Sequence, residues 1–278
     1  MGSPRWGRAA TWNACLYFVL LIVACSDGGN SAGGSSPEPQ NTPISQGAGS
    51  DPVTATPLPQ RSDVTVRIMP LGDSITQSVT PYNSYRYYLW HLLLSENYRV
   101  DFVGSRNGVG GGLPANPDFD MDHEGHAGWR ADEILANIQA WAMQASPDAV
   151  LLHIGHNDLC QGQSIASTVV DIGGIVDVLR TVNPHIHILL AQLIASSDCG
   201  IPLLNAKLPA LVADKTTAES PITLVDQYTG FDASTMTFDG THPNAIGDLR
   251  MADRWFEKLA PVLDSILTQI TEGNRAAD

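Results

Sequence analysis

Apolar and polar positions along residues 63–278 follow two alternating periods. Short apolar runs rich in β-branched residues predict strands, and the longer segments between them repeat apolar residues at helical spacing. The predicted strands cover residues 64–69, 100–103, 149–154, 186–191 and 222–225. The predicted helices cover residues 84–97, 131–145, 164–182, 203–219 and 245–270. Strands that alternate with helices are typical of α/β folds, so we expect a five-stranded parallel sheet with helices on both faces.

Two prolines lie inside predicted helices. A proline ring removes one helical hydrogen bond and crowds the preceding turn. Pro209 is therefore expected to bend or interrupt the fourth helix, and Pro261 is a candidate break in the last one.

Residues 1–62 lack this alternation and predict export instead. Arg5 and Arg8 precede the apolar run 15–24, which is too short to span a bilayer and is typical of a signal peptide. The stretch "IVAC", ending at Cys25, resembles a bacterial lipobox, in which the cysteine is lipidated after cleavage. The alternative is a simple signal peptide with an incidental cysteine, and both alternatives predict export.

Residues 26–62 are dominated by Gly, Ser, Pro, Asn and Thr, and this composition predicts a flexible linker. We therefore divide the chain into a signal and lipobox region at 1–25, the linker at 26–62 and one globular domain at 63–278. With a lipid on Cys25, a tethered domain at the cell surface or outer membrane is expected. Without the lipid, the protein would be secreted.

Two cysteines remain for the globular domain. Cys15 leaves with the signal and Cys25 is the candidate lipidation site, so Cys160 and Cys199 form a candidate disulfide in an oxidising compartment. The alternative is a pair of free thiols, because sequence spacing does not show whether the two side chains meet.

The acidic balance of the chain excludes one class of partner. The formal net charge is −14, and loss of the two arginines in the signal region lowers it to −16. Such a chain lacks the basic surface that nucleic-acid binding requires. We therefore expect no nucleic-acid partner and a neutral or weakly charged substrate.

Residues suited to chemistry follow four of the predicted strands. Ser74 follows the first strand, Gly104 ends the second in "DFVGS", "GHND" at 155–158 follows the third, and "FDGTHP" with Asp239 and His242 follows the fifth. The carboxyl ends of parallel strands lie at one edge of a sheet, and ligands bind there. The sequence thus predicts that these residues converge in space.

The residue types at this edge suit acyl transfer. A serine hydroxyl needs an imidazole to take its proton and a carboxylate to orient that imidazole, and Ser74, His242 and Asp239 fit those roles. The charge that develops on the acyl oxygen needs preorganised donors, for which we predict the backbone N–H groups of Ser74 and Gly104 and the amide of Asn157. Without a Cβ, Gly104 would let the backbone approach the substrate closely.

These blocks resemble a known superfamily. "GDSIT", Gly104, "GHND" and "DGTH" match, in order, the four blocks of the GDSL or SGNH hydrolases over residues 64–265. "RIMPLGDSIT", "YRYYL", "DFVGS", "DHEGHAGW" and "VLLHIGHNDL" look like the carbohydrate esterase branch that includes acetylxylan esterases. The resemblance implies a three-layer αβα, flavodoxin-like domain. It also implies a serine esterase mechanism without metal or other cofactor, and removal of O-acetyl groups from polysaccharide.

The chain departs from the family pattern in two places. "QSVTPYNS" follows the serine block, where the family usually has a glycine, and His156 stands where the family often has threonine. Asp73, Trp129 and His156 are candidate substrate-binding residues. His156 either touches substrate or lies at the rim of the site, and Trp129 either stacks on a sugar ring or packs against the protein.

Other types of site fit the sequence less well. His123, Glu124 and His126 match no zinc template in their spacing, so a hydrogen-bonding loop is favoured over a metal site. The glycine-rich stretch 108–114 lacks the third glycine and the helix of a dinucleotide site. No Gly-x-Ser-x-Gly elbow is present, which argues against the ordinary α/β-hydrolase fold.

The sequence therefore predicts an exported, monomeric serine esterase that deacetylates a polysaccharide such as xylan. One alternative is an esterase of the same superfamily that acts on lipid or aryl esters. A second alternative, from another class, is a catalytically inactive surface protein that binds carbohydrate.

Overall fold

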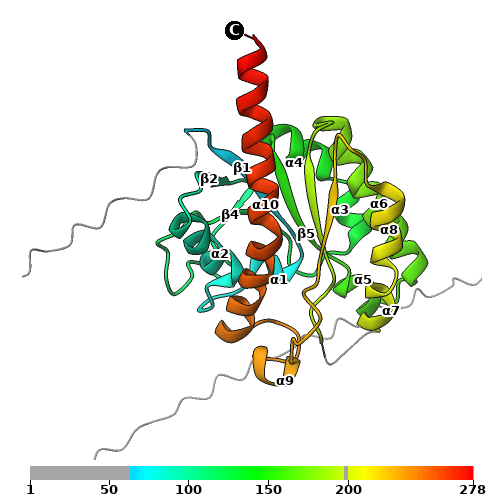
Figure 1. The fold of residues 1–278 in the computed structure, drawn as a ribbon. Helices are drawn as coiled ribbons and strands as arrows, with labels where there is room; N and C mark the ends of the chain where they lie inside the picture. Colours follow the sequence, from blue (N-terminus) through cyan, green and yellow to red (C-terminus); the bar gives the residue numbers. More distant parts are fainter. Residues whose placement is uncertain (1–62, 197–199, 278) are drawn as a thin grey trace, which may run out of the picture. The chain divides into compact units, whose positions relative to one another are not determined.

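Strand β1 (Val66–Gly72) lies at the centre of the sheet in the computed structural model, which describes residues 63–196 and 200–277 (Figure 1). The strands of this part of the chain form one sheet in the order β3-β4-β1-β5-β6-β7, and β2 also pairs with β1. Their bounds are β2 Val100–Phe102, β3 Arg106–Asn107, β4 Asp122–Gly125, β5 Ala149–His153, β6 His187–Ala191 and β7 Ile222–Val225. The signal, lipobox and linker predictions, including Cys25, lie outside the described residues.

The five predicted strands are confirmed as β1, β2, β5, β6 and β7, and all pair in parallel. The prediction of a five-stranded sheet is wrong in number, because β3 and β4 were missed. The sequence of β4, "DHEG", is short and polar and has none of the apolar alternation by which strands are recognised. β3 pairs with β4 in antiparallel fashion, so the sheet is mixed and mostly parallel.

One edge of β1 is shared by two strands. β2 pairs with the first half of β1, where Ile68 lies opposite Phe102. β4 pairs with the last two residues of β1, where Gly72 lies opposite Gly125. The strand next to the carboxyl end of β1 is therefore β4, and this determines which residues reach the functional edge of the sheet.

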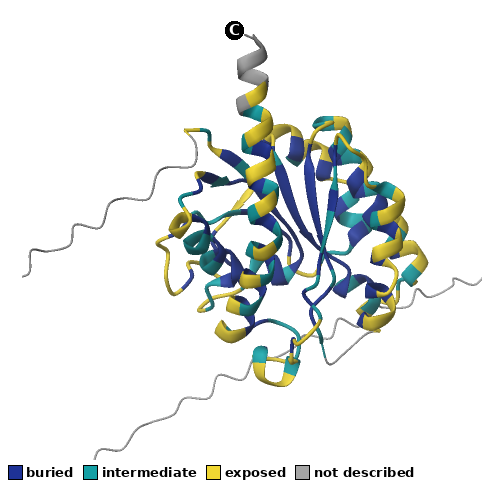
Figure 2. Cartoon of the chain, in the orientation of Figure 1, coloured by how far each residue is buried: buried dark blue, intermediate teal, exposed yellow. Residues whose placement is uncertain are grey.

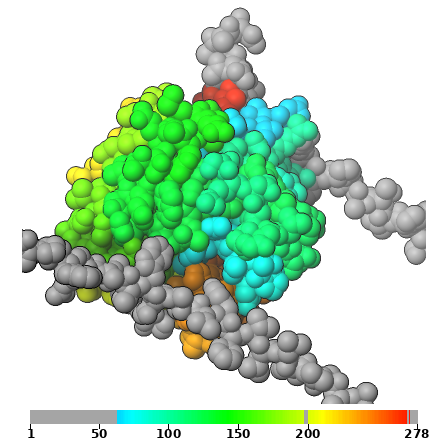
Figure 3. All heavy atoms as spheres, turned by 180° about the vertical axis from the view of Figure 1, so that it is seen from behind, coloured from blue at the N-terminus to red at the C-terminus, as the bar shows by residue number. Residues whose placement is uncertain are grey.

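Helices cover both faces of the sheet. On one face lie α3 (Ala131–Leu135), α4 (Ile138–Ala145), α6 (Ile165–Val182), α7 (Ile201–Asn205) and α8 (Leu208–Lys215). On the other lie α2 (Ser84–Ser95) and α10 (Ala245–Ala277). From behind, the first of these helical layers fills much of the visible face (Figure 3). The predicted three-layer α/β architecture is confirmed.

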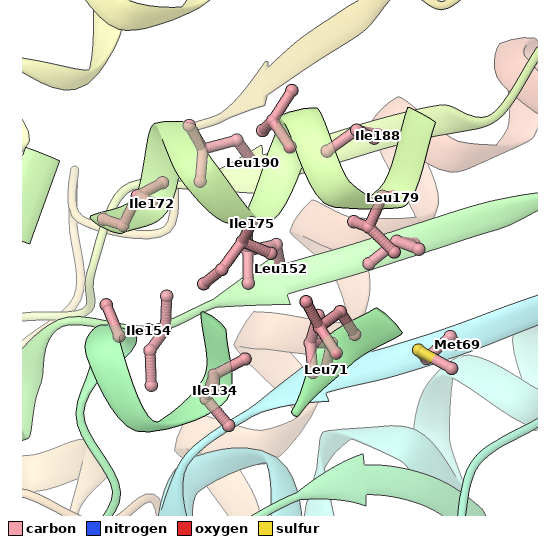
Figure 4. Close-up of a cluster of buried hydrophobic side chains, with 14 of the residues drawn as sticks. Met69, Leu71, Ile134, Leu152, Ile154, Ile172, Ile175, Leu179, Ile188 and Leu190 are labelled. Atoms are coloured by element: carbon pink, nitrogen blue, oxygen red, sulfur yellow. The ribbon is translucent and has the colours of Figure 1, made fainter. Parts of the chain in front are cut away.

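Strand side chains alternate between two apolar cores, as a period of two residues requires. Leu152 of β5 and Leu190 of β6 belong to the core under α6 (Figure 4). The neighbouring Leu151 and Leu189 belong to the core under α2 and α10. The central strands β1, β5 and β6 are buried almost throughout, and the outer faces of the helices are exposed (Figure 2). Because helices cover both faces of the sheet, polar side chains that need solvent or a ligand lie at the ends of the strands.

The prolines act differently from one another. The predicted helix 203–219 is interrupted, and α8 begins with Pro209 in its first turn, where the missing N–H costs nothing. Helix α10 continues through Pro261, which lies on its exposed side, so the predicted break is wrong. The predicted helix 131–145 is also divided, into α3 and α4. No helix in the described ranges is long and apolar enough to cross a membrane.

Three short helices begin where the chain leaves the sheet. These are α1 (Ser74–Gln77) after β1, α5 (His156–Cys160) after β5 and α9 (Ala233–Met236) after β7. All three lie toward the lower edge of the sheet in Figure 1. Three of the four segments predicted to carry chemistry, those of Ser74, Asn157 and His242, therefore lie at this edge.

Candidate active site

Ser74 is held at the junction of β1 and α1. Asp73 precedes α1, and its Oδ1 accepts a hydrogen bond from Ile75 N–H at 2.9 Å. A Cβ on Gly72 would lie 2.3 Å from the carbonyl oxygen of His153 and 2.6 Å from Thr76 Oγ1. Only glycine leaves room here for both the end of β5 and the side chain of Thr76 in α1. The strand ends in Gly-Asp-Ser because the backbone must turn here and present Ser74 at the edge.

Ser74, His242 and Asp239 form a continuous hydrogen-bonded chain. His242 Nε2 lies 2.8 Å from Ser74 Oγ, and His242 Nδ1 lies 2.7 Å from Asp239 Oδ2. Asp239 Oδ1 also accepts hydrogen bonds from the backbone N–H groups of His242 at 2.7 Å and Thr241 at 3.0 Å. Partial burial raises the pKa of Asp239, but these hydrogen bonds outweigh it and lower that pKa below its usual value. The structure thus brings together the three residues predicted from the sequence.

Two of the three predicted oxyanion donors lie at this edge. Ser74 N–H, in the first turn of α1, has no hydrogen-bond acceptor among the described residues. Asn157 lies in α5, four residues after His153, which pairs with Gly72. Its Nδ2 donates to the carbonyl oxygen of Trp129 at 2.9 Å, which orients the amide and leaves its second N–H for another acceptor.

Gly104 does not reach this edge, so its predicted role is wrong. The register of β2 places Phe102 opposite Ile68, so Gly104 lies below the carboxyl end of β1. It borders a cavity of about 170 Å³ together with Arg67 near the amino end of β1 and Trp141 of α4. A Cβ on Gly104 would lie 2.1 Å from the carbonyl oxygen of His123 in β4. Glycine is needed here for β4 to pass, not for substrate to approach.

Gly125 is the glycine that sequence reasoning missed. It lies opposite Gly72, and a Cβ there would be 2.5 Å from the backbone nitrogen of Gln77. Gly125 thus packs against the helix that begins with Ser74, and its own N–H donates to His123 Nδ1 at 2.9 Å. The segment "DHEGHAGW" contained the signal, but without β4 in the predicted sheet nothing placed it beside the serine.

Two of the three candidate substrate-binding residues, Asp73 and His156, are buried, and Trp129 is partly exposed. Asp73 is fully buried. His156 is buried too, with its Nε2 3.3 Å from the carbonyl oxygen of Ile194, so both alternatives for it, substrate contact and a place at the rim, are wrong. Trp129 stacks on His126 with ring centroids 4.5 Å apart and packs against the core, so its packing alternative is favoured.

The "DHEGHAGW" segment forms a closed hydrogen-bonded network. Glu124 is fully buried and accepts hydrogen bonds from Ser105 N and Oγ, both at 2.7 Å. Its Oε1 also lies 2.6 Å from His126 Nε2, and the His126 ring stacks on Trp141 at 4.3 Å. Within the part of the chain that the structure describes, no group of three or more acidic, histidine or cysteine side chains is placed to bind a metal.

The cysteine prediction is tested at one end. Cys160, the last residue of α5, is disulfide-bonded. Its expected partner Cys199 lies outside the described residues. A disulfide here would fasten the end of the helix that carries Asn157, and this links the redox state of the chain to the candidate site.

Burial of Asp73 gives a prediction for stability. Desolvation raises the pKa of Asp73 from 3.8 to about 7, opposed by the hydrogen bond from Ile75, and its Oδ2 has no partner among the described residues. Below about pH 4 the carboxyl is protonated in both folded and unfolded chains. As the pH rises toward 7, the unfolded chain ionises first, so stability is lost over this interval by roughly 4 kcal/mol at most.

Asp73→Asn removes this titration, because an amide is neutral at every pH in the interval. We expect the variant and the wild type to have similar free energies of unfolding near pH 4, and the variant to be the more stable by pH 7.5. Urea denaturation at several pH values measures both. A difference that stays constant with pH would contradict the raised pKa.

Comparison with known proteins identifies the family. The model of the GDSL-like Lipase/Acylhydrolase family matches residues 71–249, which include Ser74, Asn157, Asp239 and His242. The chain belongs to this family. The GDSL-like protein is accordingly a carboxylic ester hydrolase, as its related esterases also indicate.

Three relatives of this GDSL-like esterase are esterases, and one of them is described as a carbohydrate esterase. A carbohydrate esterase family 3 protein from Talaromyces cellulolyticus is 33% identical, with a TM-score of 0.66 over 72% of this chain and 99% of that chain. An acetyl esterase variant crystallised with an acetate ion is 32% identical, with the same TM-score over 72% and 99%. A "Multidomain esterase" of Ruminococcus flavefaciens is 28% identical over 221 residues, which are 70% of this chain and 28% of that protein. The matched region therefore spans under a third of the multidomain relative.

Proposed function

We propose that this GDSL-like esterase is a serine esterase that removes O-acetyl groups from a polysaccharide of the acetylxylan type. The observation that carries the proposal is the hydrogen-bonded chain from Ser74 Oγ through His242 to Asp239. A serine hydroxyl within 2.8 Å of an imidazole that is itself oriented by a carboxylate has the geometry of an activated nucleophile. An assembled chain of this kind disfavours the alternative of an inactive carbohydrate-binding protein.

The proposed reaction has two halves. Ser74 Oγ attacks the ester carbonyl carbon while His242 Nε2 accepts the hydroxyl proton. The C–O bond to the sugar then breaks, and the proton passes from His242 to the leaving sugar oxygen. The resulting acetyl-Ser74 is hydrolysed by a water molecule that His242 deprotonates, which releases acetate and restores the serine.

Asp239 and the donors at the edge assist both halves. Asp239 Oδ2 accepts a hydrogen bond from the Nδ1–H of His242, and this keeps Nε2 unprotonated and facing Ser74. The acyl oxygen becomes negatively charged during each attack. We assign Ser74 N–H and the second N–H of Asn157 as its donors, and the removal of one such donor typically costs on the order of 10² to 10³ in kcat.

The substrate class rests on the relatives and on charge. The acetyl esterase and the family 3 carbohydrate esterase both exceed 30% identity over nearly their whole length. The net charge of −14 suits a neutral polymer better than an anionic one. Export is part of the proposal, with lipid attachment at Cys25 as its stronger form. The disulfide at Cys160 supports an oxidising compartment.

Acyl chain length and polymer distinguish this function from its alternatives. We expect kcat/KM to be at least about tenfold higher for phenyl acetate than for phenyl butyrate, because each added methylene must fit a site built for acetyl. We also expect acetate release from acetylated xylan, measured with an enzyme-coupled acetate assay. Faster butyrate hydrolysis without acetate release from xylan would favour a lipid or aryl esterase instead.

A further inference from the structure

The loop that follows the serine block forms part of the wall of the site. Residues 78–83 lie along the glycine-rich segment 108–116, with Thr80 N donating to the carbonyl oxygen of Gly110 at 2.9 Å and Gly110 N donating to that of Ser78 at 3.0 Å. Farther along, Asn116 N donates to Asn83 Oδ1 at 2.8 Å. These hydrogen bonds give a fixed course to the loop that departs from the family pattern.

This loop carries Tyr82 across to the histidine segment. The ring of Tyr82 stacks on Phe238 with centroids 4.3 Å apart and planes within 6° of parallel. Phe238 in turn stacks on the His242 ring, with centroids 5.7 Å apart and planes within 17°. A row of three rings therefore runs from the loop after Ser74 to the imidazole that contacts Ser74. In Figure 3 the orange residues before α10 lie beside the cyan residues that follow β1.

The segment 238–242 needs support because no strand continues into it. β7 ends at Val225, and the segment is folded mainly on itself, with Phe238 N donating to the carbonyl oxygen of His242 at 3.0 Å. Hydrogen bonds to distant parts of the described chain include His242 to Ser74 and Thr241 to Ser196. The contact of Tyr82 with Phe238 adds a broad aromatic surface to these point contacts.

We propose that Tyr82 and Phe238 are positioning residues, whose stack holds the 238–242 segment so that His242 Nε2 stays within hydrogen-bonding distance of Ser74 Oγ. This role rests on the proposed esterase function. A displacement of about 1 Å between reacting groups can cost on the order of 10² in rate. Phe238 is 40% exposed and its neighbour Tyr82 is half-buried. Because neither ring is enclosed by the core, the contact between the two rings is what holds them parallel.

The test replaces each ring and then restores it. We expect Tyr82→Ala and Phe238→Ala each to lower kcat for phenyl acetate by about 10- to 100-fold with KM within about twofold of wild type. The same loss is expected for an acetylated xylo-oligosaccharide, since positioning acts on every ester. Tyr82→Phe and Phe238→Tyr keep the stack and should retain kcat. The double alanine variant should lose little more than either single variant, because both remove one contact.

Leu113 provides a matched control. It is an apolar side chain that is 61% exposed in the neighbouring 108–116 segment. Leu113→Ala should leave kcat and KM unchanged. Thermal unfolding of every variant is measured alongside, and the alanine variants should show the kcat loss at temperatures at which they are fully folded.

The competing outcomes each overturn the positioning role. A rise in KM limited to the oligosaccharide would make the two rings a sugar-binding surface. An unchanged kcat, or an equal loss in the ring-retaining variants, would remove any role for the stack. The rate at which a fluorophosphonate labels Ser74 separates this inference from the proposed function. A wild type that is neither labelled nor active contradicts both, whereas equal labelling of wild type and alanine variants contradicts the stack alone.

Discussion

Replacing Ser74 with alanine is expected to lower kcat for phenyl acetate by on the order of 10⁴ to 10⁶. The variant loses the hydroxyl oxygen that lies 2.8 Å from His242 Nε2, and with it the acyl-enzyme route. What remains is the binding of the ester and the donors at the edge, which by themselves give a small acceleration over water. The fold should be unaffected, since Ser74 Oγ is half-buried and its loss leaves no large cavity.

Two further variants sharpen this result. His242→Ala should cost nearly as much as Ser74→Ala, and the double variant little more, because the two groups act as one unit. Ser95→Ala is the matched control, since Ser95 lies at the exposed end of α2 and bonds only locally, to the carbonyl oxygen of Leu92. Initial rates of phenol release on freshly purified protein measure all four. Activity of Ser74→Ala within tenfold of wild type would exclude Ser74 as the nucleophile.

The structure brings Ser74, Asp239 and His242 together, as the sequence predicts, for a physical reason. Each follows a strand that the apolar pattern reveals, and parallel strands all deliver their carboxyl ends to one edge. The buried runs of β5 and β6 are apolar on both faces, so their identity needed no tertiary information. Sequence reasoning therefore succeeds where burial alone determines the element.

It failed where a polar segment enters the sheet. β4 is held by pairing with Leu71 and Gly72 and by the bonds of buried Glu124, and none of these appears as a hydrophobic period. Without β4 in the predicted sheet, Gly104 at the end of the second predicted strand was the glycine that the sequence offered as an oxyanion donor. His156 was predicted to touch substrate or lie at the rim, and it is buried against Ile194. The sequence around a histidine does not show which distant segment will bury it.

The aromatic row from Tyr82 to His242 could not be predicted at all. It joins a loop near residue 80 to one near 240, and such pairings depend on how two irregular segments meet in space. The unusual sequence after the serine block marked that loop as different without showing where it leads. Departures from a family pattern are therefore places to look for contacts specific to one chain.

The second large effect is expected at Arg86, which lies in α2 and is fully buried. Its guanidinium donates to the carbonyl oxygens of Thr76 at 3.0 Å and Gln77 at 3.2 Å, at the end of α1. It also donates to those of Met121 at 2.7 Å and Gly108 at 2.6 Å. One side chain thus joins the helix that begins with Ser74 to the two ends of the segment that connects β3 to β4.

Arg86 remains charged at neutral pH. Burial lowers its pKa from 12.5 to about 10, and nearby Tyr85 and Asp248 oppose this shift. Desolvation raises the pKa of the buried Asp248 carboxyl well above its usual value, and the charge of Arg86 offsets part of this rise. Removal of the guanidinium therefore takes a charged donor from four carbonyl oxygens and leaves a buried acid without its cation.

Arg86→Met keeps the apolar stem and should lower the free energy of unfolding by about 3–5 kcal/mol. The free energy of unfolding of Arg86→Lys should lie between those of Arg86→Met and the wild type. An ammonium group keeps the charge, but it cannot reach all four acceptors that the planar guanidinium contacts. The control is Arg67→Met. Arg67 forms an ion pair with Asp101 at 3.6 Å, and its side chain is 41% exposed. Its replacement should lower the free energy of unfolding by under about 1 kcal/mol. Urea denaturation compares the three. If Arg86→Met were as stable as Arg67→Met, the four hydrogen bonds could not be what fixes α1, and Ser74 would have to be held by the Gly72 turn and the packing of Gly125 alone.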